Sequence, residues 1–197
     1  SIRRQRQMCI RDSTKTERER SASAGAELVQ SGVDMLVVSC DYDFGAPAAL
    51  AAQKAKIISM SLCAADPKMG VQGVGNFAFT ANSAAQSEGI AIAEYAQQKL
   101  GLKTTYVLED VSIEYNKSGC AGFRAAWARV NGKESILGGD VFRNDDPSIA
   151  AQITRLQGLK NKPDSVFLCS YTPGGASAIR QLLSLIHISE PTRRYAI

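Results

Sequence analysis

The sequence has almost no histidine and no long apolar run. Its single histidine is His187, close to the C-terminus. The rest of the chain therefore lacks the imidazole that a Ser-His-Asp triad, a histidine general base or a histidine zinc site requires. No stretch reaches the roughly 18 apolar residues that a membrane-spanning helix needs. A GxxxxGK[ST] phosphate loop and a GxSxG nucleophile elbow are also missing, which disfavours P-loop nucleotide hydrolysis and α/β-hydrolase chemistry.

Cysteine is sparse, and no two cysteines form a CxxC pair. The five are Cys9, Cys40, Cys63, Cys120 and Cys169. They are too few for a disulfide-scaffold protein, and the sequence leaves open whether any two are bonded. We expect each of the last four to be a small buried residue rather than a nucleophile.

The two ends of the chain resemble one piece of DNA translated in opposite directions. Residues 8–12 (MCIRD) can be encoded by ATG TGT ATA AGA GAC, followed by AG from the next codon. The reverse complement of that string encodes Leu-Ser-Leu-Ile-His, which is residues 183–187. The string resembles the transposase adapter of sequencing libraries. We therefore expect 1–13 and 183–197 to be adapter-derived artefacts; the alternative is a basic arm and an amphipathic tail.

Removing these ends changes the charge of the chain. The whole sequence carries 23 basic and 19 acidic residues, a net charge of +4. Six of the basic and two of the acidic residues lie in the two ends, so residues 14–182 carry 17 of each. A basic arm would have indicated nucleic acid or an anionic membrane. The neutral segment gives no such indication, and we expect no nucleic-acid partner.

Between the ends, short apolar runs alternate with amphipathic, alanine-rich stretches. This alternation predicts an α/β protein with parallel sheets. The expected strands span 33–39, 56–61, 77–80, 104–108, 136–142 and 165–169. The expected helices span 17–31, 46–55, 84–100, 115–130, 147–156 and a last stretch that begins at 174 or 175. The run VDMLVVS at 33–39 predicts a strand buried on both faces.

Ligands of parallel sheets bind beyond the carboxyl ends of the strands. The loops expected there are 40–45, 62–69, 109–115, 144–147 and 170–175. The GxxGxG run at 70–75 has the reverse spacing of a dinucleotide fingerprint and is expected to be a flexible connection. The acid pair Glu109-Asp110 has no catalytic partner, so capping or hinge contacts are expected of it rather than acid–base chemistry.

Three segments at the carboxyl ends of expected strands carry residue types suited to a polar ligand. Asp41-Tyr42-Asp43-Phe44 combines carboxylates with aromatic surface, and is either a helix cap or a ligand loop. Ser59, Ser61 and Cys63 suit an anion or a turn. Tyr171 lies in a glycine-containing loop that allows close backbone approach.

The order and spacing of these elements resemble the type I periplasmic substrate-binding proteins of ABC transporters, in the branched-chain amino acid (leucine-binding) class. The resemblance runs through AELVQSGVDMLVVS, FAFTANSAAQSEG, TTYVLEDVSIEYNKSGCAGF and NDDPSIAAQITRLQGLKNKPDSVFLCSY. It implies two doubly wound parallel-sheet lobes, both incomplete here. Residues 14–80 would be the latter part of lobe one, and 81–182 the first part of lobe two.

The resemblance also implies a set of ligand-binding residues. In lobe one they are Asp41, Tyr42, Asp43 and Phe44, with Ser61 and Cys63 in the region that holds the ligand's carboxylate. In lobe two they are Tyr115 and Tyr171. CDYDFG replaces the small hydroxyl residues usual in the family, so amides, aromatic acids and other polar solutes join amino acids as candidate ligands.

The function implied is that of an extracytoplasmic solute-binding component of an ABC importer. It would bind an amino acid or similar small polar molecule in an interlobe cleft and act with a membrane permease, in the periplasm or at the cell surface. No catalysis, cofactor or metal is expected. The alternatives are the ligand-sensing domain of a regulator or receptor with the same fold, and a Rossmann-type enzyme.

Overall fold

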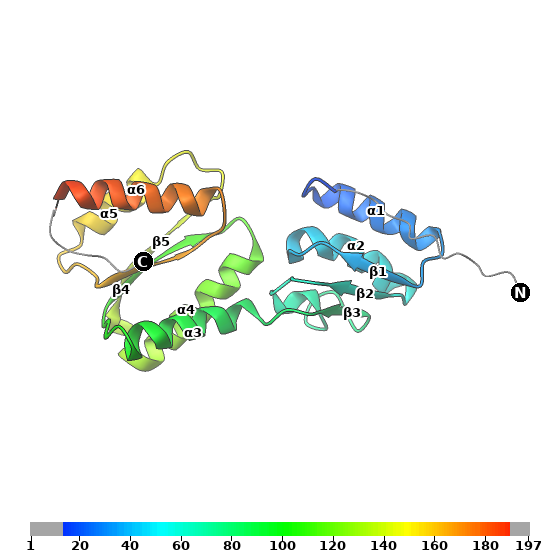
Figure 1. Cartoon of the computed structure of the whole chain (residues 1–197), viewed down its shortest axis with the longest axis horizontal. Coiled ribbons are helices and arrows are strands. Elements are labelled where there is room, and N and C mark those ends of the chain that lie inside the picture. Colours follow the sequence, from blue (N-terminus) through cyan, green and yellow to red (C-terminus); the bar gives the residue numbers. More distant parts are fainter. Residues whose placement is uncertain (1–13, 190–197) are drawn as a thin grey trace, which may run out of the picture. The chain divides into compact units, whose positions relative to one another are not determined.

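The computed structural model describes residues 14–189, with side chains to residue 184. The predicted adapter-derived segment 1–13, including Cys9, lies outside the described residues, as do 190–197 and the side chain of His187. The chain divides into two compact units, Ser1–Ser83 and Ala84–Ile197. Each unit contains its own three-stranded parallel sheet (Figure 1).

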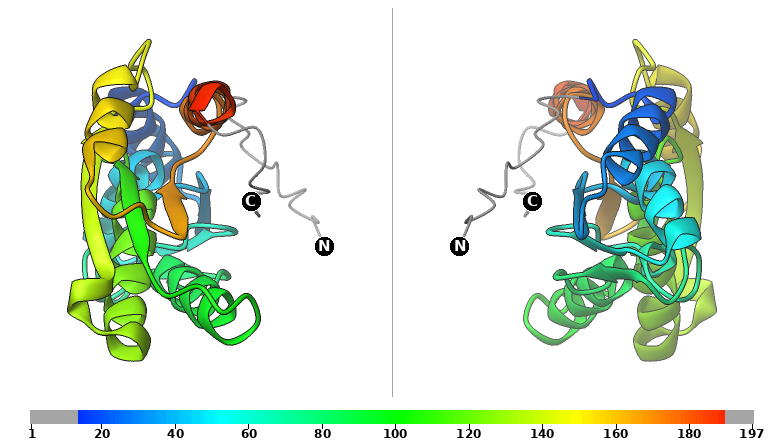
Figure 2. Two further views of the ribbon diagram at one scale, coloured as in Figure 1. Left: turned by 90° about the vertical axis from the view of Figure 1, so that its left-hand side faces the viewer. Right: turned by 90° about the vertical axis from the view of Figure 1, so that its right-hand side faces the viewer.

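The first unit has its helices on one face of its sheet. Its strands pair in sequence order and are β1 (Met35–Val38), β2 (Ile58–Ser61) and β3 (Ala78–Thr80). Its helices are α1 (Arg18–Gln30), α2 (Tyr42–Ala55) and the short 3-10 helix η1 (Pro67–Met69). α1 and α2 lie side by side over the same side of the sheet (Figures 1 and 2). They approach closely, since a Cβ added to Gly25 would lie 2.6 Å from Cα of Ala48.

The burial pattern of β1 reflects the packing of helices on one face of the sheet only. Leu36 and Val38 are 3% and 8% exposed and belong to the core under α2, whereas Met35 and Val37 are 53% and 58% exposed. The prediction that this strand is buried on both faces is therefore wrong for the described chain. The physical reason is that successive side chains of a strand point to opposite faces, and both helices cover the same one.

The second unit has helices on both faces. Its strands are β4 (Thr105–Asp110), β5 (Ile136–Phe142) and β6 (Ser165–Cys169), in the order β5-β4-β6. Its helices are α3 (Ala85–Gln98), α4 (Glu114–Asn131), η2 (Lys133–Ser135), α5 (Ala150–Gly158) and α6 (Gly174–Ser189). The layer of α3 and α4 and the layer of α5 and α6 lie on opposite sides of the sheet (Figures 1 and 2).

The central strand β4 contributes side chains to both hydrophobic cores of this unit, one on each face of the sheet. Val107 packs toward α3 and α4 with Phe123 and Trp127, while Tyr106 and Leu108 pack toward α5 and α6. All three strand residues are at most 3% exposed. Trp127 is fully buried and stacks on Phe123 with ring centroids 5.3 Å apart.

Two helices begin three or four residues away from the expected start. α2 begins at Tyr42, four residues earlier, because Asp41 takes the N-cap position; Pro47 then lies inside the helix. α5 begins at Ala150 rather than Pro147. There the Asp146 carboxylate accepts a hydrogen bond from the Arg143 N–H at 2.8 Å and closes a turn before the helix.

Glycines bring α3 and α4 into backbone contact. A Cβ on Gly89 of α3 would collide with the Gly119 carbonyl and lie 2.7 Å from the Phe123 nitrogen. A Cβ on Gly122 of α4 would lie 2.7 Å from Cα of Gln86. The two helices can therefore approach this closely only without side chains at these positions.

We expect Gly89→Ala and Gly122→Ala each to lower the free energy of unfolding by about 1–3 kcal/mol, because the added methyl overpacks the α3–α4 contact. Urea denaturation can be followed by the fluorescence of Trp127, the chain's one tryptophan. The matched control is Gly158→Ala at the end of α5, where a Cβ meets nothing within 4 Å. A loss of stability in the control as large as that in the α3 and α4 variants would contradict the account.

Candidate functional site

Parallel pairing brings the carboxyl ends of the three strands in each sheet to one edge. In the first unit this edge is formed by the segments after β1, β2 and β3, and in the second by those after β4, β5 and β6. Every ligand-binding residue predicted from the sequence lies at the last residue of a strand, as Ser61 does in β2, in the segment after a strand, or in the first turn of the helix that follows.

The segment 41–44 forms the start of α2 rather than a loop. The Asp41 carbonyl accepts hydrogen bonds from the N–H groups of Phe44 and Gly45, at 3.2 and 2.7 Å, but the Asp41 side chain makes no capping bond. Burial, and then the nearby charge of Asp43, raise the pKa of the Asp41 carboxyl. Tyr42 is partly buried against the core. The cap position is thus confirmed, without the side-chain bond expected of it.

Asp43 is engaged within the first unit. Its carboxylate is 2.6 Å from the guanidinium of Arg18, and its side chain is only 9% exposed. Arg18 is the first residue of α1, so this ion pair ties the start of α1 to the start of α2.

Ser61 and Cys63 are also engaged. The fully buried Ser61 hydroxyl donates to the Ser39 carbonyl and accepts from the Ala64 N–H, both at 3.0 Å. Cys63 forms a disulfide with Cys40, with 4.6 Å between the Cα atoms, and both residues are exposed. The expectation of small buried cysteines is wrong for this pair. The bond joins the end of β1 to the segment after β2.

In the second unit, a buried carboxylate joins the three carboxyl ends of the strands. Asp110 is fully buried, and it accepts hydrogen bonds from the Ser112 N–H at 3.0 Å and from Asn144 Nδ2 and Ser170 Oγ, both at 2.8 Å. These donors follow β4, β5 and β6. Burial alone would raise the pKa of Asp110, but the hydrogen bonds outweigh burial and lower that pKa below its ordinary 3.8.

The same network positions Tyr171. Asn144 Nδ2 also donates to the Tyr171 carbonyl at 2.9 Å, and Asn144 Oδ1 accepts from the Gly174 N–H at 3.3 Å. Tyr171 is 38% exposed, so its main chain is held at the edge while its side chain reaches solvent. The structural role expected for the acid pair is confirmed for Asp110; Glu109 pairs with Arg124 at 3.7 Å.

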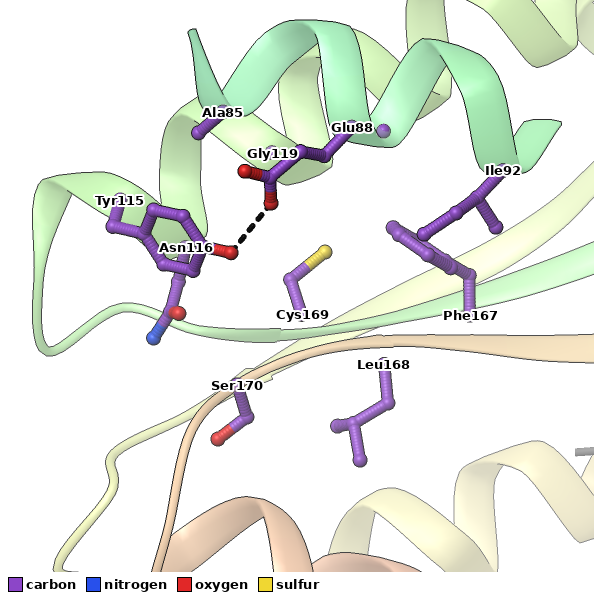
Figure 3. A pocket seen from close by; sticks show the side chains of 11 residues that line it. Ala85, Glu88, Ile92, Tyr115, Asn116, Gly119, Phe167, Leu168, Cys169 and Ser170 are labelled. Carbon is purple, nitrogen blue, oxygen red and sulfur yellow. Dashed lines mark hydrogen bonds between the residues drawn. The ribbon is translucent and has the colours of Figure 1, made fainter. Parts of the chain in front are cut away.

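Tyr115, in the first turn of α4, lines a pocket of about 120 Å³ within the second unit. Its hydroxyl donates to the Glu88 carboxylate of α3 at 2.6 Å, and the two side chains point toward each other (Figure 3). The side chains of Ile92 and Phe167 supply apolar wall, and the segment 168–170 closes the pocket at the end of β6 (Figure 3).

Two polar residues of this pocket, Glu88 and Asn116, were missed by sequence reasoning. Asn116 is 1% exposed, and neither its Nδ2 nor its Oδ1 has a hydrogen-bond partner in the described part of the chain. Glycines at 89 and 119 signal the close α3–α4 contact that brings both residues to the pocket. Nothing in the sequence itself shows which polar side chains that contact would enclose.

A second disulfide joins Cys120 of α4 to Cys169 at the end of β6, with 5.8 Å between the Cα atoms. Here the expected burial is confirmed, at 0% and 7% exposure. Within residues 14–189, no group of three or more His, Cys, Asp or Glu side chains could hold a metal ion. In the same stretch, no helix combines the length and apolarity that a membrane span requires.

We expect Asp110→Asn to lower the free energy of unfolding by about 1.5–3 kcal/mol, because hydrogen bonds to a charged acceptor are lost inside the fold. The pKa of Asp110 is lower in the folded than in the unfolded chain. Its ionised carboxylate therefore contributes fully to the free energy of unfolding above about pH 4, and this contribution is lost as the pH falls through the folded-state pKa. When urea denaturation is measured from pH 7 to pH 3, the free energy of unfolding should therefore fall less in the variant than in the unchanged chain.

The control for this prediction is Asp145→Asn, in the segment after β5. Its side chain is 83% exposed and lies 3.4 Å from Arg143. An exposed pair of this kind contributes less than about 1 kcal/mol. Equal stabilities of the Asp110 variant and the unchanged chain across this pH range would refute the role of the network.

Comparisons with solved structures show the same fold. LivJ of Streptococcus pneumoniae, a branched-chain amino acid transporter substrate-binding protein solved with isoleucine, has a TM-score of 0.77 at 22% identity, over 89% of this chain and 48% of that one. The leucine-binding protein LivK of Thermotoga maritima has 0.74 at 21%, over 88% and 48%. A Rhodopseudomonas palustris ABC-transporter solute-binding protein in complex with 3,4-dihydroxybenzoic acid has 0.69 at 19%, over 88% and 46%.

The chain thus spans about half the length of these proteins. No curated protein matches it significantly. A family model described as periplasmic binding protein matches residues 9–185. This family consists of solute-binding proteins rather than enzymes, so a Rossmann-type enzyme is set aside. Together with the two parallel sheets, the match shows that the chain belongs to the family of periplasmic binding proteins.

Proposed function

We propose that this chain is part of the solute-binding component of an ABC importer, and that the carboxyl edges of both sheets contribute to its solute site. The observation that carries the proposal is the Asp110 network, which fixes the three carboxyl ends of the second sheet and holds the Tyr171 main chain beside them. Because hydrogen bonds already fix the segments at this edge of the sheet, a ligand that binds there need not order them, and the entropic cost of binding is lower.

In the first unit, Asp41, Tyr42 and Phe44 are the proposed side-chain contacts. Asp43 is the weaker candidate because Arg18 already pairs with its carboxylate. Ser61 and Cys63 stay proposed as the region that holds a carboxylate. Since the Ser61 hydroxyl and the Cys63 sulfur are already bonded within the protein, that role would fall to main-chain N–H groups.

In the second unit, Tyr115 and Tyr171 are the proposed contacts. Tyr115 lines the pocket beside α3, and Tyr171 stands at the end of β6 with its side chain partly exposed. We propose an amino acid or a similarly small polar molecule as the solute, because the structures similar in fold were solved with isoleucine and with 3,4-dihydroxybenzoic acid. The membrane partner would be a permease.

The two disulfides support a location outside the cytoplasm. Such bonds form and persist in oxidising compartments and are rare in the cytosol. Cys40–Cys63 and Cys120–Cys169 both close within a single unit, so each is a local structural bond. They favour an exported binding protein over the alternative of a cytoplasmic regulator with the same fold.

In the full-length protein that carries this segment, we expect Tyr115→Ala and Tyr171→Ala each to weaken solute binding by about 1–3 kcal/mol, as the loss of a buried hydrogen bond does. Isothermal titration calorimetry measures the change. Tyr95→Ala is the matched control, because Tyr95 lies on α3 with 59% of its surface exposed. Unchanged affinity in both the Tyr115 and the Tyr171 variants would contradict the assignment of these residues to the solute site.

We also expect protein exported to an oxidising compartment to contain both disulfides, so that peptide mapping without reduction finds Cys40 linked to Cys63 and Cys120 linked to Cys169. The bonded cysteines are 23 and 49 residues apart in sequence. Because each bond lowers the conformational entropy of the unfolded chain, each should raise the free energy of unfolding by about 3–4 kcal/mol. Cys→Ala pairs at each bridge separate the two contributions. Four free thiols in the exported protein would contradict the location argument.

A further inference from the structure

The two disulfides of the described chain differ in their exposure to solvent. Cys40 and Cys63 are both exposed at the carboxyl edge of the first sheet, whereas Cys120 and Cys169 are 0% and 7% exposed. Thiol–disulfide exchange begins when a thiolate attacks one sulfur of the bond, so its rate depends on access to that sulfur. A dissolved thiol can therefore reach Cys40–Cys63 in the folded protein, while Cys120–Cys169 is shielded within the core of the second unit.

The segment after β2 is anchored independently of this disulfide. Asn82 Nδ2 donates a hydrogen bond to the Cys63 carbonyl at 2.9 Å, and the Thr80 hydroxyl donates to the Ala64 carbonyl at 2.6 Å. Thr80 is the last residue of β3 and Asn82 follows it closely, so both bonds hold the segment beside the third strand. Because neither bond involves sulfur, reduction of the disulfide leaves the main chain at Cys63 in place.

The segment after β1 relies more on the disulfide. Cys40 directly precedes Asp41, the N-cap residue of α2, whose side chain makes no capping hydrogen bond. On the other side of Cys40, the Ser61 hydroxyl donates to the Ser39 carbonyl at 3.0 Å. The disulfide thus ties the start of α2 covalently to a segment that is already anchored. Its reduction gives the Asp41 segment more conformational freedom, and that segment carries proposed contacts of the solute.

We propose that the Cys40–Cys63 disulfide is a site of thiol–disulfide exchange that controls solute binding by the first unit. The co-reactant is a dithiol. One thiolate of the dithiol attacks a cysteine sulfur and releases the other cysteine as a thiolate, and the second thiol of the dithiol then displaces the first cysteine from the mixed disulfide. The products are two cysteine thiols and the oxidised, disulfide form of the dithiol. The inference rests on the proposed solute-binding function and adds a means of control to it.

Solute binding and the redox state of this bond are then coupled in both directions. The reduced protein must order the Asp41 segment as the solute binds, whereas the oxidised protein has already ordered it, so reduction should lower the affinity about 5- to 50-fold. Thermodynamic linkage requires the solute to lower the equilibrium constant for reduction of Cys40–Cys63 by the same factor. A disulfide that only stabilised the fold would show no such dependence on the solute.

The experiment uses the full-length protein that carries this segment, with dithiothreitol as the dithiol. L-isoleucine and 3,4-dihydroxybenzoate are the solute probes, because structures similar in fold were solved with them. Alkylation and peptide mapping by mass spectrometry follow the reduction of each disulfide over time, with and without probe. We expect Cys40–Cys63 to be reduced at least about tenfold faster than Cys120–Cys169. Calorimetry measures the affinity of the oxidised and the reduced protein for each probe.

Two variants separate the exposed bond from the buried one. Cys40→Ala removes the bond but keeps the Cys63 side chain, so it should bind the probe with the affinity of the reduced protein, and dithiothreitol should lower that affinity no further. The matched control carries Cys120→Ala and Cys169→Ala, and it should still lose affinity when dithiothreitol is added. An unchanged circular dichroism spectrum after reduction identifies the loss of affinity as a local effect.

The outcomes distinguish the control of binding from binding itself. Faster reduction of Cys40–Cys63, lower affinity after reduction and protection of the bond by the probe would together support the proposal. Equal affinities of the oxidised and reduced protein, or equal rates of reduction of the two disulfides, would overturn it and leave the solute-binding function standing. Loss of the circular dichroism signal on reduction would also overturn it, because affinity would then fall with the whole fold. If the oxidised protein bound neither probe, the proposed class of solute would be overturned, and the control of its binding with it.

Discussion

The Asp110 carboxylate at the end of β4 has no exposed surface, and a carboxylate removed from water persists as an anion only where hydrogen-bond donors take the place of water. Here the donors come from three different segments, at Ser112, Asn144 and Ser170. Losing any one of them leaves a buried charge short of a partner, which costs more than an ordinary hydrogen bond. The three carboxyl ends of the second sheet are thereby held in one arrangement, and the main chain of Tyr171 with them.

The first unit orders its edge by different means. An ion pair joins Arg18 to Asp43, the Ser61 hydroxyl bridges two segments, and a disulfide joins Cys40 to Cys63. The far face of its sheet also differs from that of the second unit, because Met35, Val37, Ile58 and Phe79 are 44–58% exposed there. The apolar sequence of β1 is that of a strand covered on both faces, whereas the described helices cover one.

Most of the fold could be predicted from the sequence, because hydrophobic periodicity reports burial directly. β5 and β6 have the bounds expected of them, and α3 and α4 differ by one or two residues at their ends. The starts of α2 and α5 could not be predicted so well. The start of α2 depends on Asp41 taking the N-cap position. The start of α5 follows a turn that is closed by the hydrogen bond from the Arg143 N–H to the Asp146 carboxylate, and Ile149 takes its N-cap position.

The site was harder to predict than the fold. Sequence order places Tyr115 and Tyr171 at strand ends, but contacts between distant segments determine what each side chain does. The pairing of Asp43 with Arg18, the disulfide at Cys63 and the enclosure of Asn116 all arise from packing between elements. Glu88 comes to the pocket only because glycines let α3 approach α4.

The proposal that the carboxyl edges of the sheets bind the solute is tested most directly by hydrogen–deuterium exchange of the full-length protein with and without its solute. The account predicts that solute slows exchange in both units at the segments that follow the strands, namely 41–46, 62–66, 110–116 and 170–175. Protection confined to one unit, or protection at the opposite ends of the strands, would contradict it.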